Sequence, residues 1–168
     1  MNKEGLWEES TYSEEEYVSE PFDETMVKRI EDKLGYKLPQ SYIELMKEHN
    51  GGILKRCIFF YGDQEREEYI VVNGMFGIGE TKDYSLCGSM GSRFWVEEWE
   101  YPNIGVAICD CPSAGHEMIF LDYRECIIGR DEPRVVYIDQ EADYDTIVLA
   151  ETFEEFINGL KSDEEIDG

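Results

Sequence analysis

The sequence predicts an α+β fold in which a mainly antiparallel sheet of about five or six strands is flanked by N-terminal and C-terminal helices. Three observations lead to this prediction. Apolar residues recur at helical spacing before Asn50, short β-branched and aromatic runs follow Gly52, and an apolar helical stripe returns in ETFEEFINGL. The 168 residues fit one domain of ordinary size, which can bury a single core without metal or disulfide cross-links.

The first helix is expected from about Asp23 to Leu34. Gly35 accommodates the left-handed conformation that ends a helix, so the chain turns there. The apolar face of this helix is expected to comprise Met26, Val27, Ile30 and Leu34.

A second helix is expected to begin at Pro39. The proline disfavours the helical region for Leu38, and its own φ is preset for the first helical position, where an N–H is not needed. Asn50, Gly51 and Gly52 can adopt positive φ and close this helix. Its inner face is expected to comprise Tyr42, Leu45, Met46 and His49.

Five runs after Gly52 are typical of strands, because they are rich in β-branched and aromatic residues and are bounded by Gly, Pro, Asn or Asp. They are ILKRCIFF from Ile53, EYIVV from Glu68, VAICD from Val106, MIFLDY from Met118 and VVYID from Val135. The links between the last strands are too short to contain crossover helices, so these strands should pair antiparallel.

Two further helices are expected. The segment MGSRFWVEEW from Met90 has aromatic residues at a spacing compatible with a short helix. TFEEFINGLK has Thr152 and Glu155 at capping-box spacing, followed by an apolar stripe. The residues expected to be mostly buried are Leu34, Leu38, Tyr42, Leu45, Phe153 and Phe156.

The two ends of the chain are more acidic than its middle. Residues 1–20 carry seven Glu and one Lys, and residues 162–168 carry four acidic side chains and no basic one. We therefore expect an acidic N-terminal arm at 1–20, a folded domain at 21–161 and an acidic C-terminal tail at 162–168. Trp7, Tyr12 and Tyr17 make the arm less polar than a disordered tail, which leaves open whether it lies across the domain.

Charge and hydropathy limit the classes of partner. The formal net charge is −24, from 39 acidic and 15 basic side chains. Such a charge repels nucleic-acid phosphates and anionic membranes, and it favours either a cationic partner or none. No apolar run approaches the roughly 18 residues of a membrane-spanning helix, and Met1 is followed by polar residues, so a cytoplasmic protein is expected.

The chain has five cysteines, most of them inside apolar runs: Cys57, Cys87, Cys109, Cys111 and Cys126. An odd number of cysteines in such runs is typical of free thiols in a reducing compartment and argues against a disulfide framework.

The densest group of potentially reactive residues is CDCPSAGHE, from Cys109 to Glu117. Two cysteines at alternate strand positions could bind a metal ion with His116, or a cysteine could act as a nucleophile with His116 or His49. The chain has no CxxC pair, however, and it does not match the zinc-deaminase spacing. Buried thiols beside a turn are the simpler interpretation, so we expect no catalytic residue, no metal ion and no cofactor.

Two acid-rich segments are candidates for a partner-binding surface. EEWE spans Glu97–Glu100, and DQEADYD spans Asp139–Asp145. Trp95, Trp99 and Tyr101 could anchor an interface with a basic protein, although about half of such aromatic residues are expected in the core. The candidate partner-binding residues are Glu97, Glu98, Trp99, Glu100, Tyr101, Asp139, Glu141, Asp143 and Asp145.

Taken together, these residues resemble the SUKH superfamily of immunity proteins, which includes the SMI/KNR-type cell-wall regulators of fungi. IEDKLGYKLPQSYIELMKEHNGG from Ile30 is similar to the family signature of a Glu, a Leu-Gly, a Leu-Pro, a Tyr and an Asn-Gly-Gly. The resemblance continues in FGIGE, in Asp122 of FLDY, in VVYIDQEAD and in ETFEEFINGL. The family usually has Gly-Asp before the FLDY-like strand, where this chain has Gly115-His116-Glu117. The resemblance implies a structural role for the signature positions Leu34, Gly35, Leu38, Pro39, Tyr42, Asn50, Gly51, Gly52 and Asp122.

The resemblance implies an α+β domain without enzymatic activity. Bacterial members are typically immunity proteins that bind and neutralise a cognate toxin, often a nuclease. The expected partner is therefore a basic toxin protein, with no nucleic acid or membrane bound and with the chain a monomer or a weak homodimer. Acidity suits this role, because a nuclease presents a basic groove that an acidic inhibitor can occupy. The alternative is a regulatory protein-interaction module of the SMI/KNR type, and a third hypothesis is an enzyme built on CDCPSAGHE.

Overall fold

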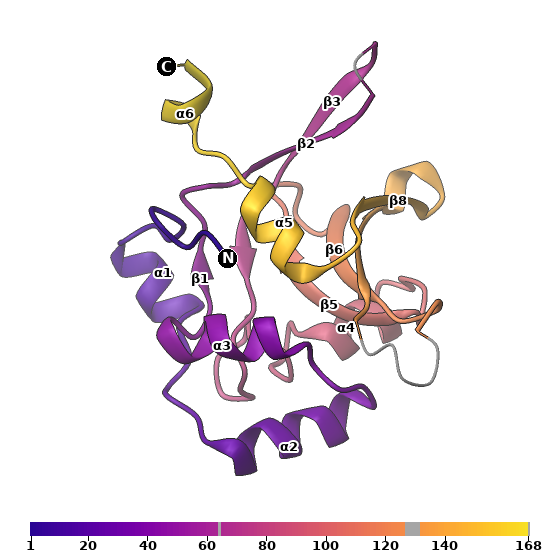
Figure 1. Ribbon diagram of the computed structural model, residues 1–168. Coiled ribbons are helices and arrows are strands. Elements are labelled where there is room, and N and C mark those ends of the chain that lie inside the picture. Colours follow the sequence, from indigo (N-terminus) through magenta and orange to yellow (C-terminus); the bar gives the residue numbers. More distant parts are fainter. Residues whose placement is uncertain (64, 127–131, 168) are drawn as a thin grey trace.

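A six-stranded antiparallel sheet forms the centre of the computed structural model, which describes residues 1–63, 65–126 and 132–167 (Figure 1). The strand order is β1-β4-β5-β6-β7-β8, and every strand pair of this sheet is antiparallel among the described residues. The strands are β1 (Gly52–Ile53), β4 (Gly74–Met75), β5 (Gly105–Asp110), β6 (Glu117–Asp122), β7 (Arg134–Asp139) and β8 (Asp145–Ala150). The α+β prediction, with a mainly antiparallel sheet, is confirmed.

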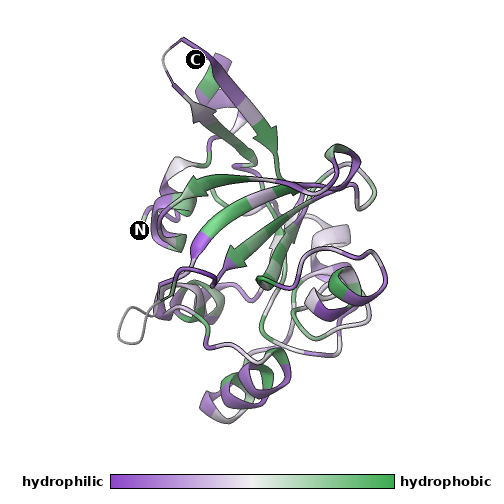
Figure 2. Ribbon diagram, turned by 90° about the vertical axis from the view of Figure 1, so that its right-hand side faces the viewer, coloured by the Kyte–Doolittle hydropathy of each residue, from purple (hydrophilic) through white to green (hydrophobic). Residues whose placement is uncertain are grey.

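Two more strands, β2 (Ile58–Gly62) and β3 (Glu67–Val71), form a separate antiparallel hairpin. This hairpin projects away from the body of the molecule (Figure 1). Its colouring by hydropathy changes from hydrophilic at the tip to hydrophobic toward the body (Figure 2).

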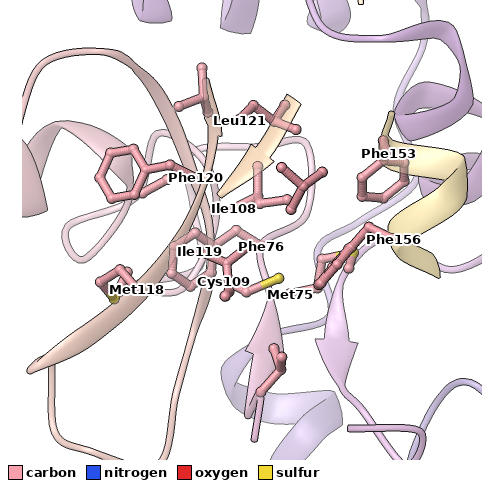
Figure 3. Packing of buried hydrophobic residues seen from close by; sticks show 14 of the residues in the cluster. Met75, Phe76, Ile108, Cys109, Met118, Ile119, Phe120, Leu121, Phe153 and Phe156 are labelled. Atoms are coloured by element: carbon pink, nitrogen blue, oxygen red, sulfur yellow. The ribbon is translucent and has the colours of Figure 1, made fainter. Parts of the chain in front are cut away.

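Helices lie at both ends of the chain and on both faces of the sheet (Figure 1). Phe153 and Phe156 of α5 point toward one face of the sheet, whereas Met118 and Phe120 lie on the opposite face (Figure 3). The hydroxyl of Ser92, in α4, accepts a hydrogen bond from the backbone N–H of Ala107 in β5 at 2.9 Å. The helices are α1 (Thr11–Glu16), α2 (Glu24–Leu34), α3 (Gln40–Glu48), α4 (Ser92–Glu97), α5 (Phe153–Gly159) and α6 (Asp163–Asp167), with a 3-10 turn η1 (Gln140–Ala142).

The boundaries of α2 follow local chemistry, as expected. The side chain of Asp23 accepts a hydrogen bond from the N–H of Met26 at 2.9 Å, and Gly35 ends the helix with φ of 82°. Leu34, expected to be mostly buried, packs against the core but is only partly buried, because it also lines a surface pocket between α2 and α4 together with Phe94. The other residues predicted to be mostly buried are buried: Leu38, Tyr42, Leu45, Phe153 and Phe156.

Helix α3 begins one residue later than predicted. Pro39 has φ of −58° and ψ of 143°, so it is the N-cap and the first helical residue is Gln40. After the helix, Asn50 is buried and its side chain is fully engaged. The amide donates to the carbonyl oxygens of Glu20 and Ile78 at 2.8 and 3.0 Å, and its oxygen accepts from the N–H of Ile78 at 2.7 Å.

The two glycines after Asn50 have positive φ, as predicted, and one of them also permits a close contact. Gly51 has φ of 90°, and a Cβ there would lie 2.7 Å from the backbone nitrogen of Gly77. The Asn-Gly-Gly signature therefore holds the 76–79 loop against the end of α3.

The run ILKRCIFF is not one strand, which corrects the sequence-based prediction. It divides into β1 and β2 around Arg56, whose side chain is 2% exposed. The Arg56 guanidinium donates to the carbonyl oxygen of Leu160 at 2.8 Å and also to that of Ile157. It further donates to the carbonyl oxygen of Asn2 at 2.9 Å, so one buried cation connects both ends of the chain. Strands β4 and β8 were not predicted, because β4 has only two residues and β8 begins inside an acidic segment.

Residues of the acidic N-terminal arm contact the domain. Leu6 and Tyr17 are buried, and Trp7 pairs with Leu54 in an isolated bridge. The hydroxyl of Tyr17 donates to the carboxylate of Asp110 at 2.8 Å. In the acidic tail, residues 163–167 form α6, and Gly168 lies outside the described residues.

Candidate functional site: an acidic corner

The two acid-rich segments singled out in the sequence meet in the structure. We call them together the acidic corner, which comprises Glu97–Glu100 at the end of α4 and Asp139–Asp145 between β7 and β8. The hydroxyl of Tyr144 donates to the backbone carbonyl oxygen of Trp99 at 2.5 Å. The Tyr144 ring also meets the edge of Tyr101 at a centroid distance of 5.3 Å. One residue of the second segment thus binds both the end of the first segment and the core below it.

The turn of CDCPSAGHE contacts both segments of the acidic corner through His116. The Nδ1 atom of His116 lies 2.9 Å from the side-chain oxygen of Gln140, and the N–H of Gln140 donates to the carbonyl oxygen of His116 at 2.8 Å. The His116 ring contacts Trp99 at a centroid distance of 5.7 Å. His116 therefore lies between the two acidic segments and contacts both.

The backbone of this region is unusual. The described non-glycine residues with positive φ all lie in these three segments: Glu100, Ala114, Asp143 and Tyr144. Positive φ is energetically costly for non-glycine residues, most of all for a bulky one, and such residues cluster at functional sites. The turn also requires a glycine, because Gly115 has φ of 94° and a Cβ there would lie 2.6 Å from the ring of Trp95. The two acidic segments are thus held in a defined arrangement.

The corner presents concentrated negative charge to solvent. It contains seven acidic side chains, and six of them are exposed, whereas Asp139 is half-buried. Asp139 accepts hydrogen bonds from the N–H groups of Glu141 and Ala142 at 3.0 and 3.3 Å, so it caps η1. Arg93 pairs with Glu97 at 3.1 Å, an exposed pair of small energetic value. The remaining charge gives the corner an attractive field for a cationic surface.

The aromatic residues of the predicted site divide between core and surface. Trp95 and Tyr101 are only 3% and 2% exposed, and the hydroxyl of Tyr101 donates to the carbonyl oxygen of Gly115 at 2.5 Å. Tyr101 is therefore not presented to a partner, which corrects its place among the candidate binding residues. Trp99 is half-buried and is flanked by Glu98 and Glu100, so its ring remains available as an anchor.

The geometry around the cysteines does not favour nucleophilic chemistry. Cys109 and Cys111 are buried, and burial raises the pKa of both thiols, so they stay protonated at neutral pH. His49 stacks on Trp7 with ring centroids 4.5 Å apart, and its Nδ1 atom lies 2.8 Å from the carbonyl oxygen of Gly51. Within the described ranges, no group of three or more His, Cys, Asp or Glu side chains is placed to hold a metal ion.

Asp122 of the family signature has a structural environment. Its carboxylate is buried and accepts from the backbone N–H and the Nε of Arg124, each at 3.0 Å, and from its Nη2 at 2.9 Å. Burial alone would raise the pKa of this carboxyl, but the hydrogen bonds and charge of Arg124, with the charge of Arg134, outweigh burial and lower it.

The two acidic segments were predicted from the sequence, but the residues that join them were not. Tyr144 and Gln140 lie inside DQEADYD, yet only its acids were proposed as binding residues. The tyrosine inside the acidic loop could have indicated this contact, because a tyrosine tends to bury its ring and to hydrogen-bond through its hydroxyl. The contact between His116 and Gln140 depends on tertiary structure and had no local signal.

The chain is similar to one family of known proteins. The model of the SMI1/KNR4 family (SUKH-1) matches residues 21–159. No curated protein and no solved structure matches the chain. Among the described residues, no helix is long and apolar enough to cross a membrane. Because the family match covers most of the sequence, including the α2–α3 signature, the chain belongs to the SMI1/KNR4 family (SUKH-1).

Proposed function

We propose that this protein is an immunity protein that binds a basic toxin protein, expected to be a nuclease, and neutralises it through the acidic corner. Membership of the SMI1/KNR4 family supports an immunity-type or SMI1-like domain. Binding of a basic toxin at the acidic corner is supported by the meeting of two acidic segments around half-buried Trp99. The hydrogen bond from Tyr144 fixes this arrangement.

The acidic side chains and the exposed part of Trp99 would have different roles in such an interface. Negative charge at the corner steers a cationic surface toward it and raises the rate of association. Affinity depends more on a few desolvated anchors, among which Trp is enriched. We therefore assign Trp99 as the anchor, and we assign the surrounding acids to attraction and orientation: Glu97, Glu98, Glu100, Glu141, Asp143 and Asp145.

The direct test is calorimetric titration of the purified chain with a catalytically inactivated toxin domain encoded beside its gene. We expect one-to-one binding, and Trp99→Ala should raise Kd by about 30-fold, which corresponds to roughly 2 kcal/mol. Trp7→Ala is the matched control, because Trp7 is also half-buried but stacks on His49 in the N-terminal arm.

Two outcomes would contradict the proposal. If the wild-type chain binds no neighbouring toxin domain, the regulatory interaction module becomes the better hypothesis. If it binds but Trp99→Ala and Trp7→Ala have equal effects, the acidic corner is not the binding site.

A further inference from the structure

The β2–β3 hairpin has one face packed on the domain and one face open. Phe59 and Ile70 are register partners, and both are buried. The Phe59 ring contacts Phe156 of α5 at a centroid distance of 5.3 Å. These residues define the inner face of the hairpin, which is covered by the chain itself.

The opposite face is also apolar. Ile58, the register partner of Val71, is buried on this face, whereas the residues around it are half-buried or exposed. Phe60 pairs with Tyr69 across the hairpin, and Val71 lies two residues further along the same face. Tyr69 is 62% exposed and Val71 is 38% exposed, whereas Phe60 is half-buried. The rings of Phe60 and Tyr69 contact each other at 5.9 Å, so they form one patch. We call Phe60, Tyr69 and Val71 the outer patch.

The outer patch departs from the pattern of a strand pair with one solvated face. Such strands alternate between apolar residues facing the core and polar residues facing water, whereas strands covered on both faces are apolar throughout. The runs IFFY in β2 and YIV in β3 are apolar on both faces. A two-stranded hairpin is also only marginally stable in water by itself. The sequence is therefore that of a hairpin covered on both sides, whereas the chain covers one side and only Ile58 on the other.

The charge of the hairpin indicates what covers the second side. Residues 62–68 carry four acidic side chains, and Arg66 is the only basic one. Glu67 lies on the same face as Tyr69, because the two residues are two positions apart in β3. In a second copy of the chain at this face, like charges would oppose one another, and the net charge of −24 adds to that repulsion. A partner with an apolar patch bordered by Lys or Arg is complementary.

The hairpin is also electrostatically connected to the region of the acidic corner. Burial, together with the neighbouring carboxylates of Glu68 and Glu117, raises the pKa of Tyr61 in β2. Glu117 directly follows His116, which contacts both acidic segments. Tyr61 pairs with Glu68 near the turn of the hairpin, so this part of the hairpin is within electrostatic range of Glu117.

We propose that the outer patch is a second docking surface, which binds a basic protein partner through Phe60, Tyr69 and Val71. The inference rests on the proposed function, because it takes this partner to be the toxin bound at the acidic corner. It assigns the toxin two contacts, a charged one at the corner and an apolar one, bordered by Glu67, on the hairpin.

The test measures binding of the full chain to the inactivated toxin domain by surface plasmon resonance. The double variant Tyr69→Thr/Val71→Thr keeps β-branched residues in β3 and removes the apolar surface. We expect its Kd to rise at least about tenfold, mainly through faster dissociation. The matched control is Tyr12→Thr/Val148→Thr, because Tyr12 and Val148 are also exposed, at 56% and 41%. The control should change Kd by less than about twofold.

Each other outcome overturns the inference in a distinct way. If the wild type and the hairpin variant bind equally, the outer patch is not a docking surface, and the proposed function stands. If the wild type does not bind, both proposals fail. If sedimentation shows a wild-type dimer that the hairpin variant abolishes, a second copy covers the patch and the basic partner is wrong. Glu67→Lys should weaken toxin binding as well. Unchanged binding would show that Glu67 does not attract a basic partner to the outer patch.

Discussion

The hydroxyl of Tyr144 and the backbone carbonyl oxygen of Trp99 are 2.5 Å apart, and this hydrogen bond joins residues that are 45 positions apart in the chain. Tyr144 adopts φ of 61° to make it, a conformation that is costly for a bulky residue. Because the acids on each side are mostly exposed, the bond fixes how the two charged segments are presented to solvent.

The first prediction concerns a substitution that removes this hydrogen bond. Tyr144→Phe should lower the free energy of unfolding by about 1 kcal/mol, the usual value of one such bond. It should raise Kd for the toxin domain several-fold, because the two acidic segments are no longer held together. Tyr123→Phe is the matched control, since Tyr123 donates to the carbonyl oxygen of Lys37 at 2.6 Å elsewhere on the molecule. Equal effects of the two variants on Kd would contradict the role of Tyr144.

The second prediction concerns salt. Association with the toxin domain should slow several-fold as ionic strength rises above 0.1 M, where the Debye length is about 10 Å, because screening weakens charge steering. Dissociation should change less, because the apolar contacts are insensitive to screening. Stopped-flow kinetics at a series of salt concentrations measures both rates. A salt effect confined to dissociation would argue against steering by the acidic corner.

The parts of the fold that were predicted correctly depend on local chemistry. Gly35 ends α2, and Asn50, Gly51 and Gly52 close the α3 corner, because capping and positive φ are properties of short segments. The site was predicted only as two separate acidic segments. Their meeting depends on the conformation of Tyr144, which no local pattern encodes.

Contacts between residues far apart in the sequence explain why the predictions for Arg56 and Tyr101 were wrong. Arg56 interrupts an apolar run because its guanidinium reaches a carbonyl oxygen of Leu160, 104 residues away. A local strand pattern contains no sign of that contact. Tyr101 was proposed as a surface residue from its acidic neighbours, but its ring packs against Phe120 in the core at 5.7 Å. Sequence spacing cannot distinguish an anchor from a core aromatic residue when both are flanked by polar residues.

The third prediction is a pH dependence of stability. Burial raises the pKa of the Asp110 carboxyl, although hydrogen bonds from Tyr17, Asn73 and the Gly74 N–H oppose this change. A raised folded-state pKa means that protonation favours the folded state. This contribution is fully present below the ordinary value of 3.8 and is lost as pH rises through the folded-state pKa.

Asp110→Asn removes the titration, so it isolates this contribution. Urea unfolding from pH 3.5 upward should show the variant gaining stability relative to the wild type until the folded-state carboxyl is ionised. A constant difference between the two proteins across the pH range would show that the Asp110 pKa is not raised.

The fourth prediction separates a binding protein from an enzyme built on the cysteines. Cys109→Ala/Cys111→Ala should lower stability by about 1 to 3 kcal/mol, because both side chains are buried in the core. Kd for the toxin domain should stay within about twofold of the wild type, since neither thiol is exposed. Loss of toxin neutralisation by a variant that is still folded, as judged by circular dichroism, would support thiol chemistry instead.

The most direct measurement of the central claim is survival of cells that express the active toxin together with variants of this chain. We predict that Glu97→Lys/Glu98→Lys/Glu100→Lys abolishes protection. The control Glu24→Lys/Asp32→Lys/Glu44→Lys should protect fully, because it makes the same change in net charge at exposed acids of α2 and α3. Circular dichroism and expression level must match the wild type for both variants. Full protection by the acidic-corner variant, or equal loss in both variants, would contradict neutralisation through the acidic corner.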